Sequence, residues 1–127
     1  MSNRTTPQAI GGYFDLELPR TGKFQHNNAK YFQSARAAFR TLLQAVQPTR
    51  VWLPRYICNS MITPLKDEGI NIEWYDLDED LHILPSSVRL KENDFLLYVN
   101  YFGVCQSGVD LLLREFPAEK VILDYSQ

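Results

Sequence analysis

Three short segments of the sequence carry residue types that could bind a charged small molecule: Ser34-Ala35-Arg36, Pro54 to Ser60, and Asp124 to Gln127. Ser34 stands directly before a stretch with helical periodicity, and the first turn of a helix exposes unpaired backbone N–H groups and a partial positive charge. A phosphate bound there would also meet the Ser34 hydroxyl and the Arg36 guanidinium. Asp124 follows an apolar segment, where a carboxylate can face a ligand at the end of a strand. The residues alone leave ordinary alternatives open, because Ser is a favoured helix cap and Asp often caps a turn.

Histidine and cysteine chemistry is not indicated by the spacing of these residues. His26 and His82 have no partner at metal-ligand spacing and belong to no recognisable Ser-His-Asp motif. Cys58 and Cys105 lie far apart and outside any paired-cysteine motif. We therefore expect two buried thiols, which behave as small hydrophobic side chains, and no metal site.

The segments that must position these residues alternate between helical and strand patterns. Helical periodicity runs from Ser34 to Pro48, from Ile57 to Gly69 with Pro64 predicting a kink or early break, and from Val109 to Phe116 with Leu111, Leu112, Leu113 and Phe116 on its buried side. Strand-like runs occupy residues 51–53, 71–75, 95–99 and 121–123. This order predicts an α/β fold with a mostly parallel sheet and right-handed βαβ crossovers.

Length, composition and charge narrow the class of protein further. The chain has 127 residues, 45% of them hydrophobic and 22% charged, which is typical of one folded domain. Residues 1–30 should form an arm with one short strand at 13–18, and residues 31–127 an α/β domain. Thirteen basic against fifteen acidic residues, with no basic block, predict no nucleic-acid or membrane partner. A polar N-terminus and the lack of a bilayer-length apolar run favour a cytoplasmic protein.

Six motifs, taken in their order along nearly the whole chain, resemble the DegT-type sugar aminotransferases, a branch of the fold-type-I pyridoxal-phosphate enzymes. They are Gly11-Gly12-Tyr13-Phe14, Ser34-Ala35-Arg36, Leu53-Pro54-Arg55-Tyr56-Ile57-Cys58, Tyr75-Asp76-Leu77-Asp78, Asn100-Tyr101-Phe102-Gly103 and Asp124-Tyr125-Ser126-Gln127. The resemblance implies that residues 31–127 are a partial α/β cofactor-binding domain, equivalent to the front part of the large domain of such an enzyme.

The resemblance also implies roles for individual residues toward pyridoxal phosphate. Ser34, Ala35 and Arg36 would hold the cofactor phosphate, although the family usually has glycine in place of Ala35. Asp124 would pair with the protonated pyridine nitrogen, and Gln127 matches the residue that approaches the phenolic oxygen of the ring.

Stacking on the cofactor ring is where the sequence departs from the family pattern. Cys58 falls where an aromatic residue often stacks, which makes Tyr56 the alternative stacking partner. This segment therefore adds Tyr56 and Cys58 to the expected cofactor-binding residues.

No residue of the chain matches the family's Schiff-base lysine, which lies well downstream of the Asp-x-x-Gln motif. The lysines present are Lys23, Lys30, Lys66, Lys91 and Lys120. The resemblance thus implies the N-terminal portion of a sugar aminotransferase-like protein of amino-sugar or surface-polysaccharide biosynthesis, with no catalytic residue of its own and inactive alone. Full-length family members act on nucleotide sugars, and their sites form between two subunits, so a homo-oligomer is expected.

Two other readings of the sequence remain open. One is a non-enzymatic α/β binding or interaction module derived from the same fold. The other is a flavodoxin-like or receiver domain, which fits the βαβ order but lacks the acidic cluster at early strand ends that a receiver needs.

Overall fold

A single parallel sheet organises the part of the chain that the structure describes. The structure is a computed structural model that describes residues 28–126, so the strand expected at 13–18 and Gln127 lie outside the described residues. Within them, four strands pair in the order β2-β1-β3-β4: β1 (Arg50–Pro54), β2 (Asn71–Tyr75), β3 (Asp94–Val99) and β4 (Val121–Asp124). Every pairing is parallel. The fold class predicted from the sequence is confirmed.

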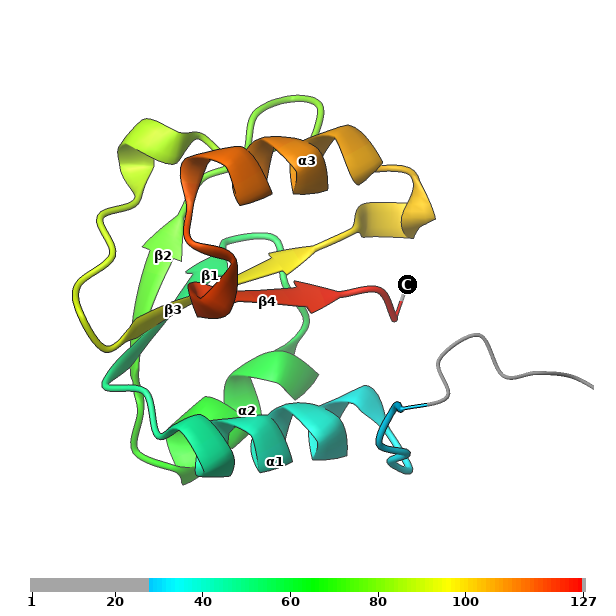
Figure 1. Cartoon of the computed structure of the whole chain (residues 1–127), viewed down its shortest axis with the longest axis vertical. Helices are drawn as coiled ribbons and strands as arrows, with labels where there is room; N and C mark the ends of the chain where they lie inside the picture. Colours follow the sequence, from blue (N-terminus) through cyan, green and yellow to red (C-terminus); the bar gives the residue numbers. More distant parts are fainter. Residues whose placement is uncertain (1–27, 127) are drawn as a thin grey trace, which may run out of the picture. The chain divides into compact units, whose positions relative to one another are not determined.

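Helices cover both faces of this sheet (Figure 1). The α-helices of the described region are α1 (Ala35–Val46), α2 (Asn59–Asp67) and α3 (Gln106–Glu115). α1 and α2 lie on one face, and α3 lies on the other. α2 connects β1 to β2 and α3 connects β3 to β4, so each forms a βαβ crossover.

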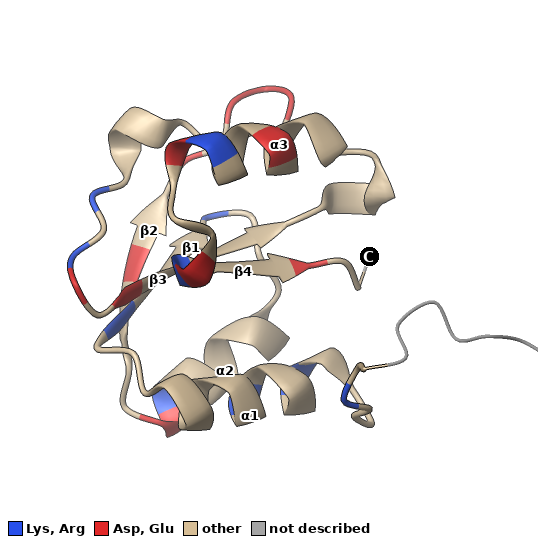
Figure 2. Cartoon of the chain, viewed as in Figure 1, with Lys and Arg blue, Asp and Glu red and all other residues tan. Residues whose placement is uncertain are grey.

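The loop that follows β2 is the most acidic part of the described surface. It carries Asp76, Asp78, Glu79 and Asp80, and it appears red beside α3 in Figure 2. An isolated antiparallel bridge between Leu77 and Ile83 closes the loop at its base.

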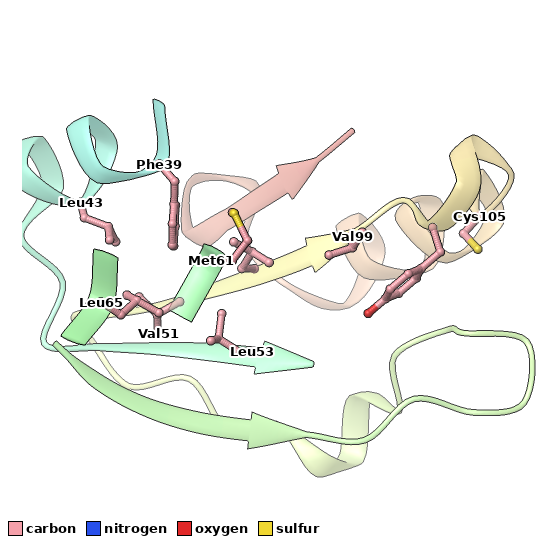
Figure 3. Packing of buried hydrophobic residues seen from close by; sticks show 10 residues of the cluster. Phe39, Leu43, Val51, Leu53, Met61, Leu65, Val99 and Cys105 are labelled. Atoms are coloured by element: carbon pink, nitrogen blue, oxygen red, sulfur yellow. The ribbon is translucent and has the colours of Figure 1, made fainter. Parts of the chain in front are cut away.

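Alternating side chains of β1 and β3 divide the hydrophobic core into two clusters. Figure 3 shows the cluster beneath α1 and α2, where Val51, Leu53 and Val99 meet helix residues such as Phe39 and Leu65. On the opposite face, the buried residues of β3 and the elements above it are Leu96, Tyr98, Ile83, Val88, Val109 and Leu112. β3 therefore contributes to both clusters, which explains why its sequence is continuously apolar.

Two predictions about the helices are corrected. α2 shows no early break at Pro64 but continues to Asp67, with the proline ring buried and one helical N–H missing. α3 begins at Gln106, three residues before the apolar pattern starts. Leu113 is 43% exposed, because the buried face of α3 follows the helical spacing of Val109 and Leu112.

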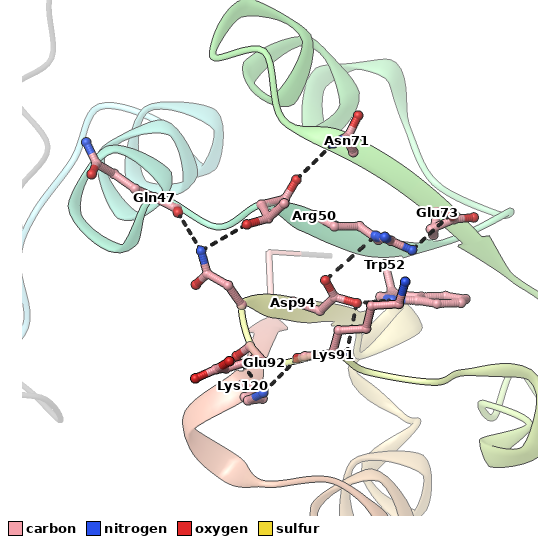
Figure 4. A network of polar contacts seen from close by, with 11 residues as sticks. Gln47, Arg50, Trp52, Asn71, Glu73, Lys91, Glu92, Asp94 and Lys120 are labelled. Carbon is pink, nitrogen blue, oxygen red and sulfur yellow. Dashed lines mark hydrogen bonds and ion pairs between the residues drawn. The ribbon is translucent and has the colours of Figure 1, made fainter.

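A polar network joins the strands at their amino ends (Figure 4). Asp94 is only 2% exposed, and its Oδ2 accepts hydrogen bonds from Trp52 Nε1 at 3.2 Å and Lys91 N at 3.0 Å. Arg50 Nε lies 3.7 Å from Asp94 Oδ1, and Arg50 also donates to Glu73 Oε1 at 3.2 Å. The network ties β1, β2 and β3 together where they begin.

Candidate functional site

The carboxyl ends of the strands and the amino ends of the helices meet at one edge of the sheet. All four described strands are parallel, so β1, β3 and β4 end at the same edge. Each helix leads by a short connection into the start of the next strand, and its own N-terminus therefore lies at the carboxyl edge. Ligands of open α/β sheets bind at this edge.

Asp124 and Ala35 share a cavity at this edge, of about 200 Å³, between α1 and β4. Its remaining lining residues are Ala38, Phe39, Leu42, Met61, Ile122 and Leu123. The Asp124 side chain is nearly buried, and Oδ1 accepts a hydrogen bond from Ser126 N at 2.8 Å. Oδ2 has no hydrogen-bond partner within the described residues. One carboxylate oxygen is therefore available to a donor in an otherwise apolar cavity.

Ser34 and Arg36 line a different cavity, of about 250 Å³, between α1 and α2. Ser34 caps α1, because its Oγ accepts a hydrogen bond from Ala37 N at 3.1 Å. The helix-cap alternative considered for Ser34 is thus present in the structure. Of the three residues expected at the phosphate, the structure brings only Ala35 into the cavity of Asp124.

Tyr56 and Cys58 line a third cavity, of about 210 Å³, together with Ile57 and Tyr101. The Tyr56 ring, 61% exposed, stacks on the Tyr101 ring with 5.5 Å between centroids. Tyr101 Oη donates to the Tyr56 carbonyl at 2.6 Å. Of the two stacked rings, only Tyr56 is exposed, beside the end of β1, because Tyr101 is buried.

Of the two thiols that the sequence predicts to be buried, only Cys105 is buried. Cys58 is exposed, and its Sγ lies 2.7 Å from Ser60 Oγ. Its exposure follows from its position as the residue before α2, at the open edge of the sheet.

The surroundings of Tyr101 keep its hydroxyl protonated. Burial raises the pKa of Tyr101 well above its ordinary value, and neighbouring groups that include Asp124 raise it further. The hydroxyl therefore stays protonated and keeps its hydrogen bond to Tyr56.

The lysines of residues 31–126 lie at the opposite edge of the sheet. Lys66 is in the last turn of α2, Lys91 precedes β3, and Lys120 precedes β4. Lys120 Nζ donates to the carbonyls of Lys91 and Glu92 at 2.8 and 2.7 Å. Within this range, no lysine amine is at the carboxyl edge.

A group of polar residues around His82 was missed by sequence reasoning. His82 Nε2 lies 3.0 Å from Ser107 Oγ, and His82 Nδ1 lies 3.9 Å from Asp78 Oδ2. The sequence shows no motif that joins these three residues, and the structure places Ser107 within hydrogen-bond distance of His82, with Asp78 Oδ2 further away. Only the four-residue spacing of Asp78 and His82 was visible in the sequence, since Ser107 is brought in from 25 residues away by α3.

Comparison with known proteins supports an α/β unit of the aminotransferase type at the level of fold. No model of a protein family and no curated protein matches the chain. Ten chains of solved structures match. Among them is the crystal structure of a candidate aminotransferase from Burkholderia pseudomallei, with a TM-score of 0.53 and 16% sequence identity. The match covers 69% of this chain and 29% of that chain, so this chain spans less than a third of the matched protein.

The described residues add two findings that bear on the class of site. No cluster of three or more His, Cys, Asp or Glu side chains in this region is arranged to hold a metal ion. None of its helices has the length and apolar character needed to cross a bilayer.

Proposed function

We propose that this chain is the N-terminal portion of a pyridoxal-phosphate-dependent aminotransferase that acts on a nucleotide-linked sugar, in amino-sugar or surface-polysaccharide synthesis. The observation that carries the proposal is the shared cavity of Asp124 and Ala35 at the carboxyl edge of the sheet. The aminotransferase-type fold supports the cofactor, and the DegT-like motifs support the sugar substrate.

The donor set of this edge fits the cofactor. Asp124 Oδ2 is an acceptor without a partner among the described residues, in a cavity with apolar walls, which suits a protonated ring nitrogen. The backbone N–H groups at the start of α1, where Ala35 lines the same cavity, would be donors for the phosphate. Bound pyridoxal phosphate would supply an electron-withdrawing ring, and the protein would supply orientation and charge. Tyr56, stacked on Tyr101, would bound the ring space on the side of β1.

A chain with these residues alone is expected to bind the cofactor without transferring an amino group. Amino transfer by this class of enzyme needs a lysine at the cofactor, as nucleophile and base. The lysines of residues 31–126 lie at the far edge of the sheet. A rate of amino transfer from glutamate clearly above that of free pyridoxal phosphate would contradict this expectation.

Cofactor titration of the full chain tests the proposal. The absorbance of pyridoxal phosphate should shift on binding, and Asp124→Ala should weaken binding by about tenfold to about 150-fold, because a charge-assisted hydrogen bond contributes about 1.5–3 kcal/mol. Asp110→Ala, at an exposed position of α3, is the matched control and should bind like the unmodified chain. Borohydride reduction followed by intact mass then reports any lysine adduct, and the proposal expects none at stoichiometric yield. No spectral shift, or equal affinity for both variants, would refute the cofactor site.

The second candidate function is a non-enzymatic binding module that keeps the fold. It is favoured by the separation of Ser34 and Arg36 from the Asp124 cavity, and by the hydrogen bond that engages Cys58 with Ser60. This module predicts no spectral change with pyridoxal phosphate. It also predicts that Asp124→Ala alters nothing but solubility.

Self-association through β4 belongs to the same proposal. Among the described strands, β4 pairs only with β3, so the N–H and C=O groups of its other side are unpaired. Its residues Val121, Ile122 and Leu123 are only partly buried. A second copy of the chain would cover this edge, and a clean monomer at high concentration by light scattering would count against it.

A further inference from the structure

We propose that Ser107, His82 and Asp78 form a second site, which hydrolyses small neutral or cationic carboxylic esters by way of an acyl-serine. The proposal is independent of the cofactor site, since it uses the loop after β2 and the start of α3. It rests on the mutual geometry of the three side chains and on the contacts that hold them.

The distances suit proton transfer from Ser107 to His82. Ser107 is exposed at the second position of α3, and its Oγ lies 3.0 Å from His82 Nε2, within hydrogen-bond distance. A nucleophile within hydrogen-bond reach of a base that a third group orients is the signature of an activated serine. With the proton on Nδ1, facing Asp78 Oδ2 at 3.9 Å, Nε2 is free to accept the serine proton.

Several contacts fix the loop that carries His82. Asp78 Oδ1 accepts hydrogen bonds from the backbone N–H groups of Asp80 at 2.9 Å and His82 at 2.8 Å. Tyr98 Oη donates to the Leu81 carbonyl at 3.0 Å, where Leu81 is in the left-handed conformation with φ 63°. Burial is the main cause that raises the pKa of Tyr98 to about 12, so this donor is retained at neutral pH. These contacts fix the backbone of the loop on the core, so the position of the imidazole does not depend on the His82 side chain alone.

Gly108 creates the space in which the imidazole approaches α3. A Cβ at this position would lie 2.7 Å from His82 Cδ2 and would also collide with the Tyr98 hydroxyl. Glycine is otherwise unfavourable inside a helix. Its presence directly after Ser107 lets the histidine ring lie against the first turn.

The start of α3 supplies hydrogen-bond donors for a developing oxyanion. The backbone N–H groups of Gln106 and Ser107 have no hydrogen-bond acceptor within the described residues, and the Cys105 side chain does not cap the helix. Donors of this kind stabilise the tetrahedral oxygen in acyl transfer. These two N–H groups add to the Ser107–His82 pair, and that pair is the feature that defines the site.

The reaction balances with water and the ester as the only reactants. Ser107 Oγ bonds to the ester carbonyl carbon and its proton moves to His82 Nε2. The bond to the leaving alkoxide breaks, and His82 returns the proton to it. Water then attacks the acyl-serine with His82 as base, which releases the carboxylic acid and restores Ser107.

Openness and charge define the substrate class. Ser107 lies on an exposed surface, so a small acyl group fits best. The neighbouring loop carries Asp76, Asp78, Glu79 and Asp80 (Figure 2), and its negative charge disfavours anionic esters.

A serine-directed fluorophosphonate and p-nitrophenyl acetate are the probes for the full chain. The fluorophosphonate should label one residue, Ser107, as its oxygen bonds to phosphorus, fluoride leaves and His82 takes the proton. Peptide mapping by mass spectrometry locates the label. Ser107→Ala and His82→Gln should abolish labelling, whereas Ser86→Ala, at an exposed serine with no hydrogen bond among the described residues, should not.

Hydrolysis of p-nitrophenyl acetate should fall by about 100-fold in His82→Gln, the lower end of what a general base contributes. Asp78→Asn keeps the Oδ1 acceptor of the loop but removes the charge that orients His82, so it should lower the rate and alter the pH profile without unfolding the chain.

Three results would overturn the proposal: no label on the unmodified chain, a label on another residue, or hydrolysis that survives Ser107→Ala. The first needs no variant, so it decides even if a variant fails to fold. Because none of these readouts involves pyridoxal phosphate, they leave the proposed cofactor function untouched.

Discussion

The two edges of the sheet use their polar groups in opposite ways. At the amino edge, the buried Asp94 accepts hydrogen bonds from Trp52 and Lys91 and lies beside Arg50, so its charge is engaged inside the molecule. At the carboxyl edge, the Asp124 carboxylate accepts one hydrogen bond, from the backbone N–H of Ser126 to Oδ1. Its other oxygen, Oδ2, has no partner within the described residues. The same type of residue, at opposite edges of the sheet, is structural in one place and available for binding in the other.

This difference has a physical origin in the parallel sheet. The amino edge is where short connections return to the next strand, so its polar groups are close enough to pair with one another. The carboxyl edge is where helices begin, with N–H groups that lack helical acceptors. Both proposed sites use the carboxyl edge, since the cofactor site involves the start of α1 and the ester site the start of α3.

The largest expected effect is a loss of stability in Asp94→Ala. Removal of this carboxylate leaves the Trp52 and Lys91 N–H groups without their acceptor and takes away the negative charge beside Arg50 Nε, while Arg50 keeps its hydrogen bond to Glu73. Breaking a buried ion pair of this kind costs about 3–5 kcal/mol, and the partial exposure of Arg50 places the expectation near 3 kcal/mol. Urea unfolding of the full chain measures it.

Asp124→Ala is the matched control at the other edge. It should change the free energy of unfolding by less than about 1 kcal/mol, because one hydrogen bond is lost and one unpaired charge is removed. Equal losses of unfolding free energy in Asp94→Ala and Asp124→Ala would show that both carboxylates are structural. The proposed difference between the two edges would then be wrong.

The sequence predicted the helices and strands that follow from a local pattern of apolar residues. Ser34 followed by apolar residues at three- and four-residue steps predicted α1, and the apolar run at 95–99 predicted β3. The start of α3 was missed because Gln106, Ser107 and Gly108 carry no apolar periodicity, and Gly108 is there for the space it leaves.

Contacts between residues far apart in the sequence could not be predicted from local sequence patterns. Whether Ala35 or Arg36 faces Asp124 depends on how α1 is rotated against β4, which no local spacing specifies. The contact of His82 with Ser107 likewise depends on the packing of α3 over β3. The residues proposed for the cofactor site were named from the sequence, but the division of the described ones among three cavities was not.

An intermediate effect is expected from alkaline pH, because tyrosine hydroxyls stabilise the carboxyl half of the sheet. Tyr75, Tyr98 and Tyr101 each donate to a backbone carbonyl, and burial raises the pKa of each above its ordinary value. Their contribution is complete below about pH 10, the pKa of an unfolded tyrosine. It is lost as pH rises, for Tyr98 between that value and about 12.

The free energy of unfolding should therefore decline above about pH 10. Tyr98→Phe removes one hydroxyl, so it should cost about 1 kcal/mol at neutral pH and make the alkaline decline shallower. Urea titrations at a series of pH values compare the two proteins. A decline of equal slope in both would mean that Tyr98 has no part in it.

A small effect on stability is expected at the N-terminus of α1, in Ser34→Ala. The substitution removes the acceptor of the Ala37 N–H group, which should cost about 1 kcal/mol of stability. Ser34→Gly should lower the stability by only a few tenths of about 1 kcal/mol, since glycine leaves the exposed N–H groups accessible to water. If Ser34 is only a cap, both variants bind pyridoxal phosphate as the unmodified chain does. If its hydroxyl also contacts the phosphate, both bind more weakly by the same factor although their stabilities differ, so parallel unfolding and cofactor titrations separate capping from binding.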